Sequence, residues 1–381
     1  MKNLYNKNSF CVIISHTPYC KSYNGDLVGL GSTVEEIDRL STIFNKIYHF
    51  APIHGGEPPL SYMKHENAEI EIIPMISVGG KNFGDKFKHI LFFFKHLKKI
   101  KPYLNKTDLI HFRVPTGFGL LFLPWLYLFW KKNIWVKYAG SWNSNSVPLT
   151  YKIQRWMLLR FPSNFKITIN SPSEKLGDNF FTFCNPCFDK KIIAKNYDIV
   201  QKKNFKKELN LVFVGRVEEK KGISSLLEIM EDIVHLNIIK KLQIVGDSNR
   251  LDYYINKAKK ISDKICLTGP LSRKDVFNIY SHSHIIILLS HSEGLPKVLM
   301  EAAVFGCVPI VSNFSGISKI IKDNHNGFIL ESYNGQYDYN EFKTIIHNPL
   351  ALKKCSLNAY KTSHDFTYEK YLKNIKDAIL F

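Results

Sequence analysis

Two glutamates, Glu293 and Glu301, flank a predicted turn and helix start, so both carboxylates could contact one ligand. The apolar run 284–290 before them is typical of a buried strand, and Gly294 and Pro296 end it. Segment 297–305 is rich in good helix formers. A helix that begins at Pro296 would present unpaired N–H groups and a partial positive charge, which favour a phosphate. Glu301 would lie about 7–8 Å further along the helix axis.

The residues alone leave a structural role open for Glu301. Lys297 precedes it by four positions on the same predicted helix face. A lysine before a glutamate at this spacing contributes at most a few tenths of a kcal/mol. The spacing is therefore compatible with a ligand contact or with a weak ion pair.

The surrounding residues resemble a known signature. Glu293-Gly294-Leu295-Pro296, then Glu301-Ala302-Ala303, Gly306 and Pro309, is similar to the signature of retaining glycosyltransferases of family 4. The resemblance extends from segment 211–223 to the Asn326-Gly327 turn, and over the N-terminal half it is loose. It implies the GT-B fold, an α/β architecture in which two Rossmann-like domains with parallel sheets face each other across a cleft. The last helix is expected to cross back to the first domain.

The resemblance also implies a role for each matched residue. Arg216 and Lys221, after the predicted strand 209–215, would bind the donor diphosphate, the arginine through two hydrogen bonds and the lysine as a point charge. Lys220 is the rival for the second role, but Lys221 directly precedes Gly222 and matches better. Glu301 would hold the ribose hydroxyls, and Glu293 would hold the donor sugar. The remaining expected donor contacts are Gly294, Leu295, Pro296, Val298 and Leu299.

Negative charge builds on the departing diphosphate during sugar transfer, and fixed cations can stabilise it. The resemblance accordingly implies a metal-independent enzyme without a cofactor. The substrate would be a nucleoside-diphosphate sugar of the UDP or GDP type.

The N-terminal half offers fewer candidates. Gly29 and Gly31 resemble a family glycine loop that faces the cleft, whereas a nicotinamide site is excluded because the third glycine and the ribose-binding acid are missing. His111, Arg113 and Gly140, at the ends of two predicted strands, are the acceptor-side candidates. Related enzymes commonly carry a histidine at the second of these strand ends. This chain has Tyr138-Ala139-Gly140-Ser141 there instead.

Composition favours anionic partners, because 52 basic against 33 acidic residues give a net charge of +19. Nucleic acid is not expected, since no helix-turn-helix, zinc-finger or RNA-binding signature is present. Lys86 to Lys106 contains seven lysines and no acid, and is either a solvated basic helix face or a peripheral contact with anionic membrane.

The chain lacks the apolar core of a signal peptide, and its seven scattered cysteines suit a reducing compartment. We therefore expect a cytoplasmic protein, with membrane contact at the inner face. The uncharged stretch from Val114 to Trp130 falls just short of a membrane-spanning length and is expected to be a buried helix.

Alternating strands and helices predict two α/β domains. We expect an acceptor-binding domain over 1–188 with a C-terminal helix at about 366–381, a linker over 189–208, and a donor-binding domain over 209–365. The resemblance implies a retaining glycosyltransferase that acts on a glycan or lipid-linked acceptor in surface polysaccharide biosynthesis. A non-catalytic nucleotide-sugar-binding partner subunit and a sugar-nucleotide epimerase on the same fold are the alternatives.

Overall fold

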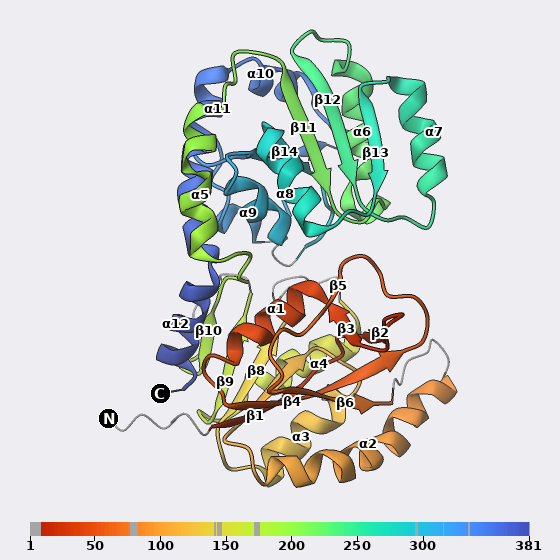
Figure 1. Cartoon of the computed structure of the whole chain (residues 1–381), viewed down its shortest axis with the longest axis vertical. Helices are drawn as coiled ribbons and strands as arrows, with labels where there is room; N and C mark the ends of the chain where they lie inside the picture. Colours follow the sequence, from red (N-terminus) through yellow and green to blue (C-terminus); the bar gives the residue numbers. More distant parts are fainter. Residues whose placement is uncertain are drawn as a thin grey trace. The chain divides into compact units, whose positions relative to one another are not determined.

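The computed structural model describes residues 9–76, 83–140, 142, 147–170, 176–293, 296–314, 316–333 and 336–380, with side chains described except at 83–91, 333 and 336. The chain divides into two compact units (Figure 1). The first contains the residues up to Cys184 together with the C-terminal segment from Tyr371. The second is Asn185–Lys370.

The first unit is built on a 10-stranded sheet in the order β10-β9-β8-β7-β1-β4-β2-β3-β5, with β6 also pairing with β4. Its pairs are parallel except β2–β3 and β3–β5. The strands are β1 (Phe10–Ile14), β2 (Tyr19–Lys21), β3 (Leu27–Leu30), β4 (Lys46–His54), β5 (Tyr62–Lys64), β6 (Ile70–Met75), β7 (Leu109–Val114), β8 (Ile134–Tyr138), β9 (Phe165–Ile169) and β10 (Phe180–Thr182).

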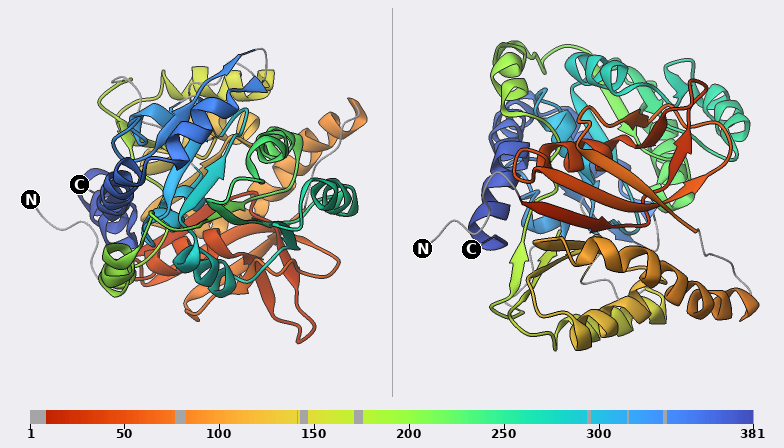
Figure 2. Two further views of the ribbon diagram at one scale, coloured as in Figure 1. Left: turned by 90° about the horizontal axis from the view of Figure 1, so that it is seen from above. Right: turned by 60° about the horizontal axis from the view of Figure 1, so that its bottom comes forward.

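Helices cover both faces of this sheet (Figure 2). On one face, α2 (Phe83–Leu104), α3 (Gly119–Phe129) and α4 (Leu149–Leu158) enclose a core that contains Val12. On the other, α1 (Gly31–Leu40) and α12 (Tyr368–Ala378) pack around the neighbouring Ile13. Successive strand residues point to opposite faces, so β1 contributes to both cores. The C-terminal helix packs against the first unit, as the sequence predicted.

The second unit has a 6-stranded parallel sheet in the order β13-β12-β11-β14-β15-β16. This is the doubly wound order 3-2-1-4-5-6, which reverses direction between β11 and β14. The strands are β11 (Leu209–Val214), β12 (Ile239–Val245), β13 (Ile265–Gly269), β14 (Ile285–Leu288), β15 (Val308–Ser312) and β16 (Phe328–Leu330), with β17 (Ser332–Tyr333) and β18 (Gln336–Tyr337) as a separate hairpin. The helices are α5 (Lys190–Lys202), α6 (Ile223–Ile233), α7 (Leu251–Ile261), α8 (Arg273–His282), α9 (Lys297–Ala303), α10 (Tyr339–Ile346) and α11 (Pro349–Ser363).

The segment 189–208, expected as a linker, contains helix α5 instead. Ile193 and Val200 are buried at a spacing of seven residues, and Tyr360 of α11 donates a hydrogen bond to the Ile193 carbonyl at 2.8 Å. Lys353 of α11 also donates to the Val200 carbonyl at 3.0 Å, near the end of α5. The many lysines of α5 make the segment look polar in the sequence, so its short apolar stripe is not recognised there. This stripe packs against α11.

Candidate functional site

The candidate site lies in the second unit, at the carboxyl edge of β11 and β14. These two strands are neighbours and mark the point where the strand order reverses, which is where open α/β sheets bind ligands. The loop after each strand carries predicted site residues. The backbone N–H of His291 donates to the Lys220 carbonyl at 3.1 Å and joins the two loops.

Gly222 makes this close approach of the two loops possible. It ends the short 3-10 helix Glu219–Lys221 with φ +75°, a left-handed conformation that side chains disfavour. A Cβ atom at this position would lie 2.0 Å from the Leu289 carbonyl oxygen. A glycine is therefore required directly after Lys221, and its presence fixes that lysine beside the β14 loop.

Lys221 and Glu293 meet between the two loops. The Lys221 ammonium donates a hydrogen bond to Glu293 Oε1, and the hydroxyl of Ser290 donates to the same oxygen at 3.0 Å. The side chains of Lys221 and Glu293 are 24% and 12% exposed, so water screens the pair only partly. The pair provides a fixed cation beside a carboxylate that can accept hydrogen bonds from hydroxyl groups.

Arg216 lies in a neighbouring depression of about 190 Å³. Its guanidinium is 64% exposed and its Nε is 3.9 Å from Glu218 Oε2. Asp247, Arg250 and Tyr254 line the same depression. Lys221 is not among the residues that line this depression.

Glu301 has a partner that the sequence did not indicate. Its Oε1 is 3.7 Å from Nη2 of Arg273 at the start of α8, and its side chain is 16% exposed. The same Nη2 donates to the Cys187 carbonyl, and the guanidinium lies 4.9 Å from the ring centre of Phe277. Arg273 is 28 positions before Glu301, so no local spacing links them, and only the packing of α8 against α9 brings them together.

Helix α9 begins at Lys297, with Pro296 as the residue before its first turn rather than within it. The N–H of Leu299 donates to the Pro296 carbonyl at 3.3 Å, so this amide already has a partner inside the first turn. Val298 lies in the same turn. The predicted donor contacts Gly294 and Leu295 lie outside the described residues.

The two predicted glycines Gly29 and Gly31 approach protein atoms closely. Gly29 is within β3, where an added Cβ would lie 2.6 Å from the ring of Tyr19. Gly31 is the first residue of α1, and its Cβ would lie 2.7 Å from the Ser61 carbonyl oxygen. Both glycines therefore belong to regular elements, a strand and the start of a helix, and their role as donor contacts stays a prediction.

Two of the acceptor-side candidates, His111 and Gly140, are also next to protein groups. The ring of His111 on β7 is fully buried, stacks on Trp135 at 3.7 Å and donates through Nδ1 to the Trp135 carbonyl at 3.3 Å. This burial holds the pKa of His111 well below its ordinary value, so the imidazole is neutral. An added Cβ at Gly140, after β8, would lie 3.2 Å from the ring of Tyr138. His111 is therefore a core residue, and its acceptor-side assignment is wrong.

Arg113 belongs to a buried ionic cluster that the sequence did not predict. Glu36 of α1 accepts hydrogen bonds through Oε1 from Lys137 Nζ at 2.7 Å and the Tyr371 hydroxyl at 2.8 Å, and Arg113 Nη1 lies 3.4 Å away. The side chains of Glu36 and Lys137 are each 3% exposed. The partners of Glu36 come from β7, β8 and α12, far away in the sequence.

A second polar network crosses the same unit and ends at Ser15. It runs from Asp38 to His65 (2.7 Å), Tyr19 (2.8 Å), His49 (3.1 Å) and Ser15 (2.7 Å). Burial keeps the pKa of His49 well below its ordinary value. The network therefore fixes the direction in which the Ser15 hydroxyl points.

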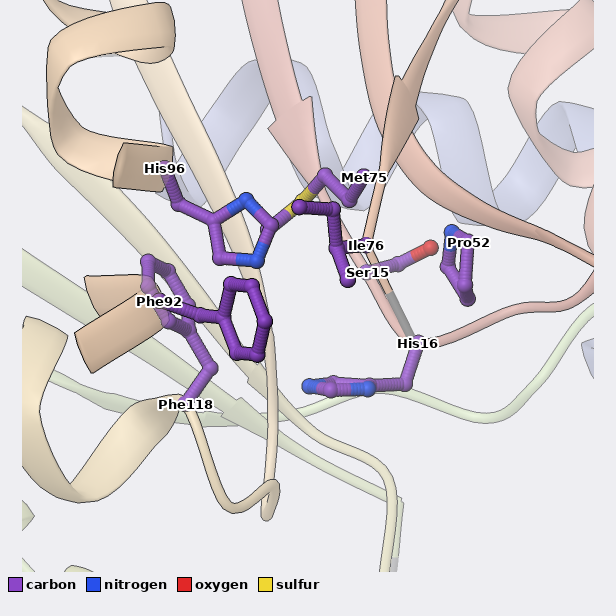
Figure 3. A pocket seen from close by; sticks show the side chains of 8 residues that line it. All are labelled: Ser15, His16, Pro52, Met75, Ile76, Phe92, His96 and Phe118. Atoms are coloured by element: carbon purple, nitrogen blue, oxygen red, sulfur yellow. The ribbon is translucent and has the colours of Figure 1, made fainter. Parts of the chain in front are cut away.

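Ser15 lines a small pocket of the first unit beside α2 (Figure 3). Apart from Ser15, the lining is aromatic, imidazole and apolar: His16, Pro52, Met75, Ile76, Phe92, His96 and Phe118. The cavity holds only about 20 Å³, close to the space that a single water needs. It is too small to hold a sugar ring without rearrangement.

Among the residues that the structure describes, no group of three or more histidine, cysteine, aspartate or glutamate side chains is arranged to hold a metal ion. None of the described helices combines the length and the apolar composition needed to cross a membrane. The stretch from Val114 to Trp130 contains helix α3, in which Phe122, Leu123 and Leu126 are buried.

Fold and site together define an α/β protein with two Rossmann-like units and a polar site at the strand-order reversal of the second. Comparison with known proteins adds the reaction class. Residues 195–362 match the family model Glycosyl transferases group 1. An uncharacterized glycosyltransferase of Haemophilus influenzae is 24% identical over 292 residues, which cover 75% of this chain and 81% of that protein.

The name of a second relative specifies its acceptor and the sugar that it transfers. The Campylobacter jejuni enzyme GalNAc-alpha-(1->4)-GalNAc-alpha-(1->3)-diNAcBac-PP-undecaprenol alpha-1,4-N-acetyl-D-galactosaminyltransferase is 27% identical over 257 residues, 62% of this chain and 67% of that one. The structure of HepE from Anabaena in complex with UDP and glucose aligns with a TM-score of 0.67 at 13% identity, over 97% of this chain and 99% of that chain. The predicted α/β fold of the GT-B type is confirmed by such likeness, and the sequence matches support a glycosyltransferase.

Proposed function

We propose that this protein is a retaining, metal-independent glycosyltransferase of family 4 that uses a nucleoside-diphosphate sugar of the UDP or GDP type. The observation that carries the proposal is the pairing of Lys221 with Glu293 where the strand order reverses between β11 and β14. This arrangement places a cation and a hydroxyl-binding carboxylate at one ligand-binding edge. The family match over residues 195–362 includes both side chains.

Each polar group of this edge has a chemical task in the proposed reaction. Lys221 stabilises the negative charge that develops on the departing diphosphate, while Glu293 accepts hydrogen bonds from the donor sugar. Glu301, held by Arg273, accepts hydrogen bonds from the ribose. The Arg216 side chain is 64% exposed and its contact with Glu218 is long, at 3.9 Å, so it can turn towards the diphosphate when donor binds.

The proposed acceptor is a glycan or lipid-linked saccharide in surface polysaccharide biosynthesis. The name of the Campylobacter jejuni relative specifies an undecaprenol-linked saccharide, and a further relative from Erwinia amylovora is named for amylovoran biosynthesis. An acceptor with a lipid carrier would place the enzyme in the cytoplasm at the inner face of the membrane. The net charge of +19 supports contact with that anionic surface.

The donor can be identified by thermal shift. Each candidate nucleoside-diphosphate sugar is added to the protein, and a ligand that binds the folded state raises the melting temperature. The donor so identified is then incubated with lipid-linked acceptors, and released nucleoside diphosphate and glycosylated acceptor are measured. Acceptor-dependent release supports the transferase. Binding without any turnover would instead indicate a partner subunit, and conversion of the donor sugar without acceptor would indicate an epimerase.

A further inference from the structure

The first unit exposes an unusually apolar surface on two neighbouring helices. We call it the α3–α4 surface and define it as Tyr127, Leu128, Phe129, Leu149, Ile153, Trp156 and Leu159. Leu149 is 72% exposed, Phe129 65% and Trp156 55%. Single exposed apolar side chains are ordinary, but a set that shares one pair of helices marks an interaction site.

Two sets of contacts show that α3 and α4 lie side by side and that part of this surface is continuous. Leu149, Ile153 and Trp156 recur at intervals of four and three residues, so they form one stripe along α4. At the end of α3, the ring of Tyr127 stacks on Phe161, which follows α4, at 5.4 Å. The end of α3 therefore lies beside the last turn of α4, and Figure 2 shows the two helices in the same layer.

The stretch of sequence that contains α3 and α4 carries charge of one sign. From residue 109 to residue 173 the sequence contains no aspartate or glutamate. The basic residues of this stretch are Arg113, Lys131, Lys132, Lys137, Lys152, Arg155, Arg160 and Lys166. Lys131, Lys132, Lys152 and Arg160 are exposed, and the Arg160 guanidinium lies 4.3 Å from the ring centre of Trp156.

We propose that the α3–α4 surface binds the headgroup layer of an anionic phospholipid membrane. Leucine and phenylalanine side chains enter the acyl boundary, while tryptophan and tyrosine rings settle at headgroup level. The surrounding lysines and arginines attract the lipid phosphates. A second copy of the chain is a poor occupant, because the charged side chains of residues 109–173 are all basic and would repel their counterparts in the other copy.

This inference rests on the proposed function only for its biological purpose, which is access to a lipid-linked acceptor. It differs from the sequence analysis, which named residues 86–106 as either a solvated basic face or a membrane contact. In α2, Phe94 is 66% exposed, but its neighbour Phe93 is buried in the core. The two surfaces can be separated by mutation.

The test is co-sedimentation of the full chain with phosphatidylcholine vesicles, with or without phosphatidylglycerol. We expect wild-type protein to bind the anionic vesicles, to bind neutral vesicles far less, and to dissociate as salt is raised. The double substitution Leu149→Ser with Trp156→Ser should reduce the partition coefficient by about tenfold or more. Leu350→Ser, at a comparably exposed leucine of α11 (76%), is the matched control and should bind like wild type.

Charge reversal by Lys152→Glu with Arg160→Glu provides a second variant that leaves the apolar side chains in place. It should lower binding to anionic vesicles and flatten the salt dependence. Circular dichroism and transfer to a water-soluble acceptor, both expected to be unchanged, separate failure of this inference from failure of the proposed function.

Three results would overturn the inference. The first is equal binding of wild type and both double variants to anionic vesicles. The second is that Phe94→Ser abolishes vesicle binding while the α3–α4 substitutions leave it unchanged, which would assign the contact to α2. The third is that wild-type protein sediments as a dimer without lipid and that the double substitution Leu149→Ser with Trp156→Ser makes it monomeric. This result would make the surface a contact between two copies of the chain.

Discussion

Lys221 and Glu293 form an ion pair between the loops that follow β11 and β14, and the hydroxyl of Ser290 donates to the same glutamate oxygen. The lysine follows one strand and the glutamate follows its neighbour, 72 residues later. Each residue holds the other in place at the ligand-binding edge of the sheet.

Lys221→Ala should lower the transfer rate by at least about a hundredfold, because the cation that stabilises the leaving diphosphate is lost. The rate is measured as release of nucleoside diphosphate at saturating acceptor. The exposed neighbour Lys220 provides the control, and Lys220→Ala should retain near-normal transfer. A Lys221→Ala enzyme with a near-normal rate and an unchanged melting temperature would contradict the assignment.

Glu301→Ala should also reduce transfer at least about a hundredfold, with a raised dissociation constant for the nucleoside diphosphate itself. The substitution removes the proposed ribose contact and leaves Arg273 without its carboxylate at 3.7 Å. Calorimetric titration with the diphosphate measures the effect directly. Glu228→Ala, at an exposed glutamate of α6, should leave binding unchanged. Equal affinities in the two variants would argue for a purely structural Glu301.

Gly222→Ala should destabilise the second unit by several kcal/mol and displace Lys221. The new methyl group would lie 2.0 Å from the Leu289 carbonyl oxygen in addition to facing an unfavourable φ of +75°. Gly25→Ala isolates the second effect, because Gly25 has φ +81° and nothing within 4 Å of its Cβ. That control should cost only about 1–2 kcal/mol in chemical denaturation. If both variants lost the same free energy of unfolding, the two loops could move apart to accept the methyl group at no energetic cost.

Glu36→Ala should reduce the free energy of unfolding of the first unit by about 3–5 kcal/mol, because Lys137 would be left as a buried, uncompensated charge. Urea denaturation measures the loss. The double substitution Glu36→Ala with Lys137→Met should recover a large part of it, since of the three charges only Arg113 then remains, and its side chain is 14% exposed. If the double variant had the same free energy of unfolding as Glu36→Ala, the loss would come from packing alone.

Acidification should destabilise the second unit through His284. Burial lowers the pKa of His284 to about 4, below its ordinary value of 6.5. Between these values the unfolded chain binds more protons than the folded one, so stability falls as the pH falls through this window. From pH 7 to pH 5 this single group should remove about 2 kcal/mol.

His284→Gln tests that prediction through the slope of unfolding free energy against pH. In the variant, the part of this slope that comes from one titrating proton should disappear. The variant should also be less stable than wild type at neutral pH where the bond from the Asn210 N–H to His284 Nδ1 is weakened. His325→Gln, at an exposed position, should keep the wild-type slope. An unaltered slope in His284→Gln would mean that other groups carry the acid sensitivity.

Much of the second unit could be predicted from local sequence. Strand runs such as 284–290, the helix formers after Pro296, and the glycine after Lys221 each specify a conformation through short-range sterics and periodicity. Parallel strands connected by helices follow from their alternation. These features place Lys221 and Glu293 on loops that follow two predicted strands of one parallel sheet.

Only the tertiary structure decided which polar residues face which neighbours. His111 and Arg113 are two positions apart on β7, yet one stacks on Trp135 in the core and the other approaches Glu36. Glu301 faces Arg273, and the lysine-rich segment 189–208 forms helix α5 because α11 lies against it. Periodicity assigns a residue to a face of its own element. The identity of the opposing side chain depends on elements distant in sequence, and burial makes that contact decisive because a charge removed from water must find its partner there.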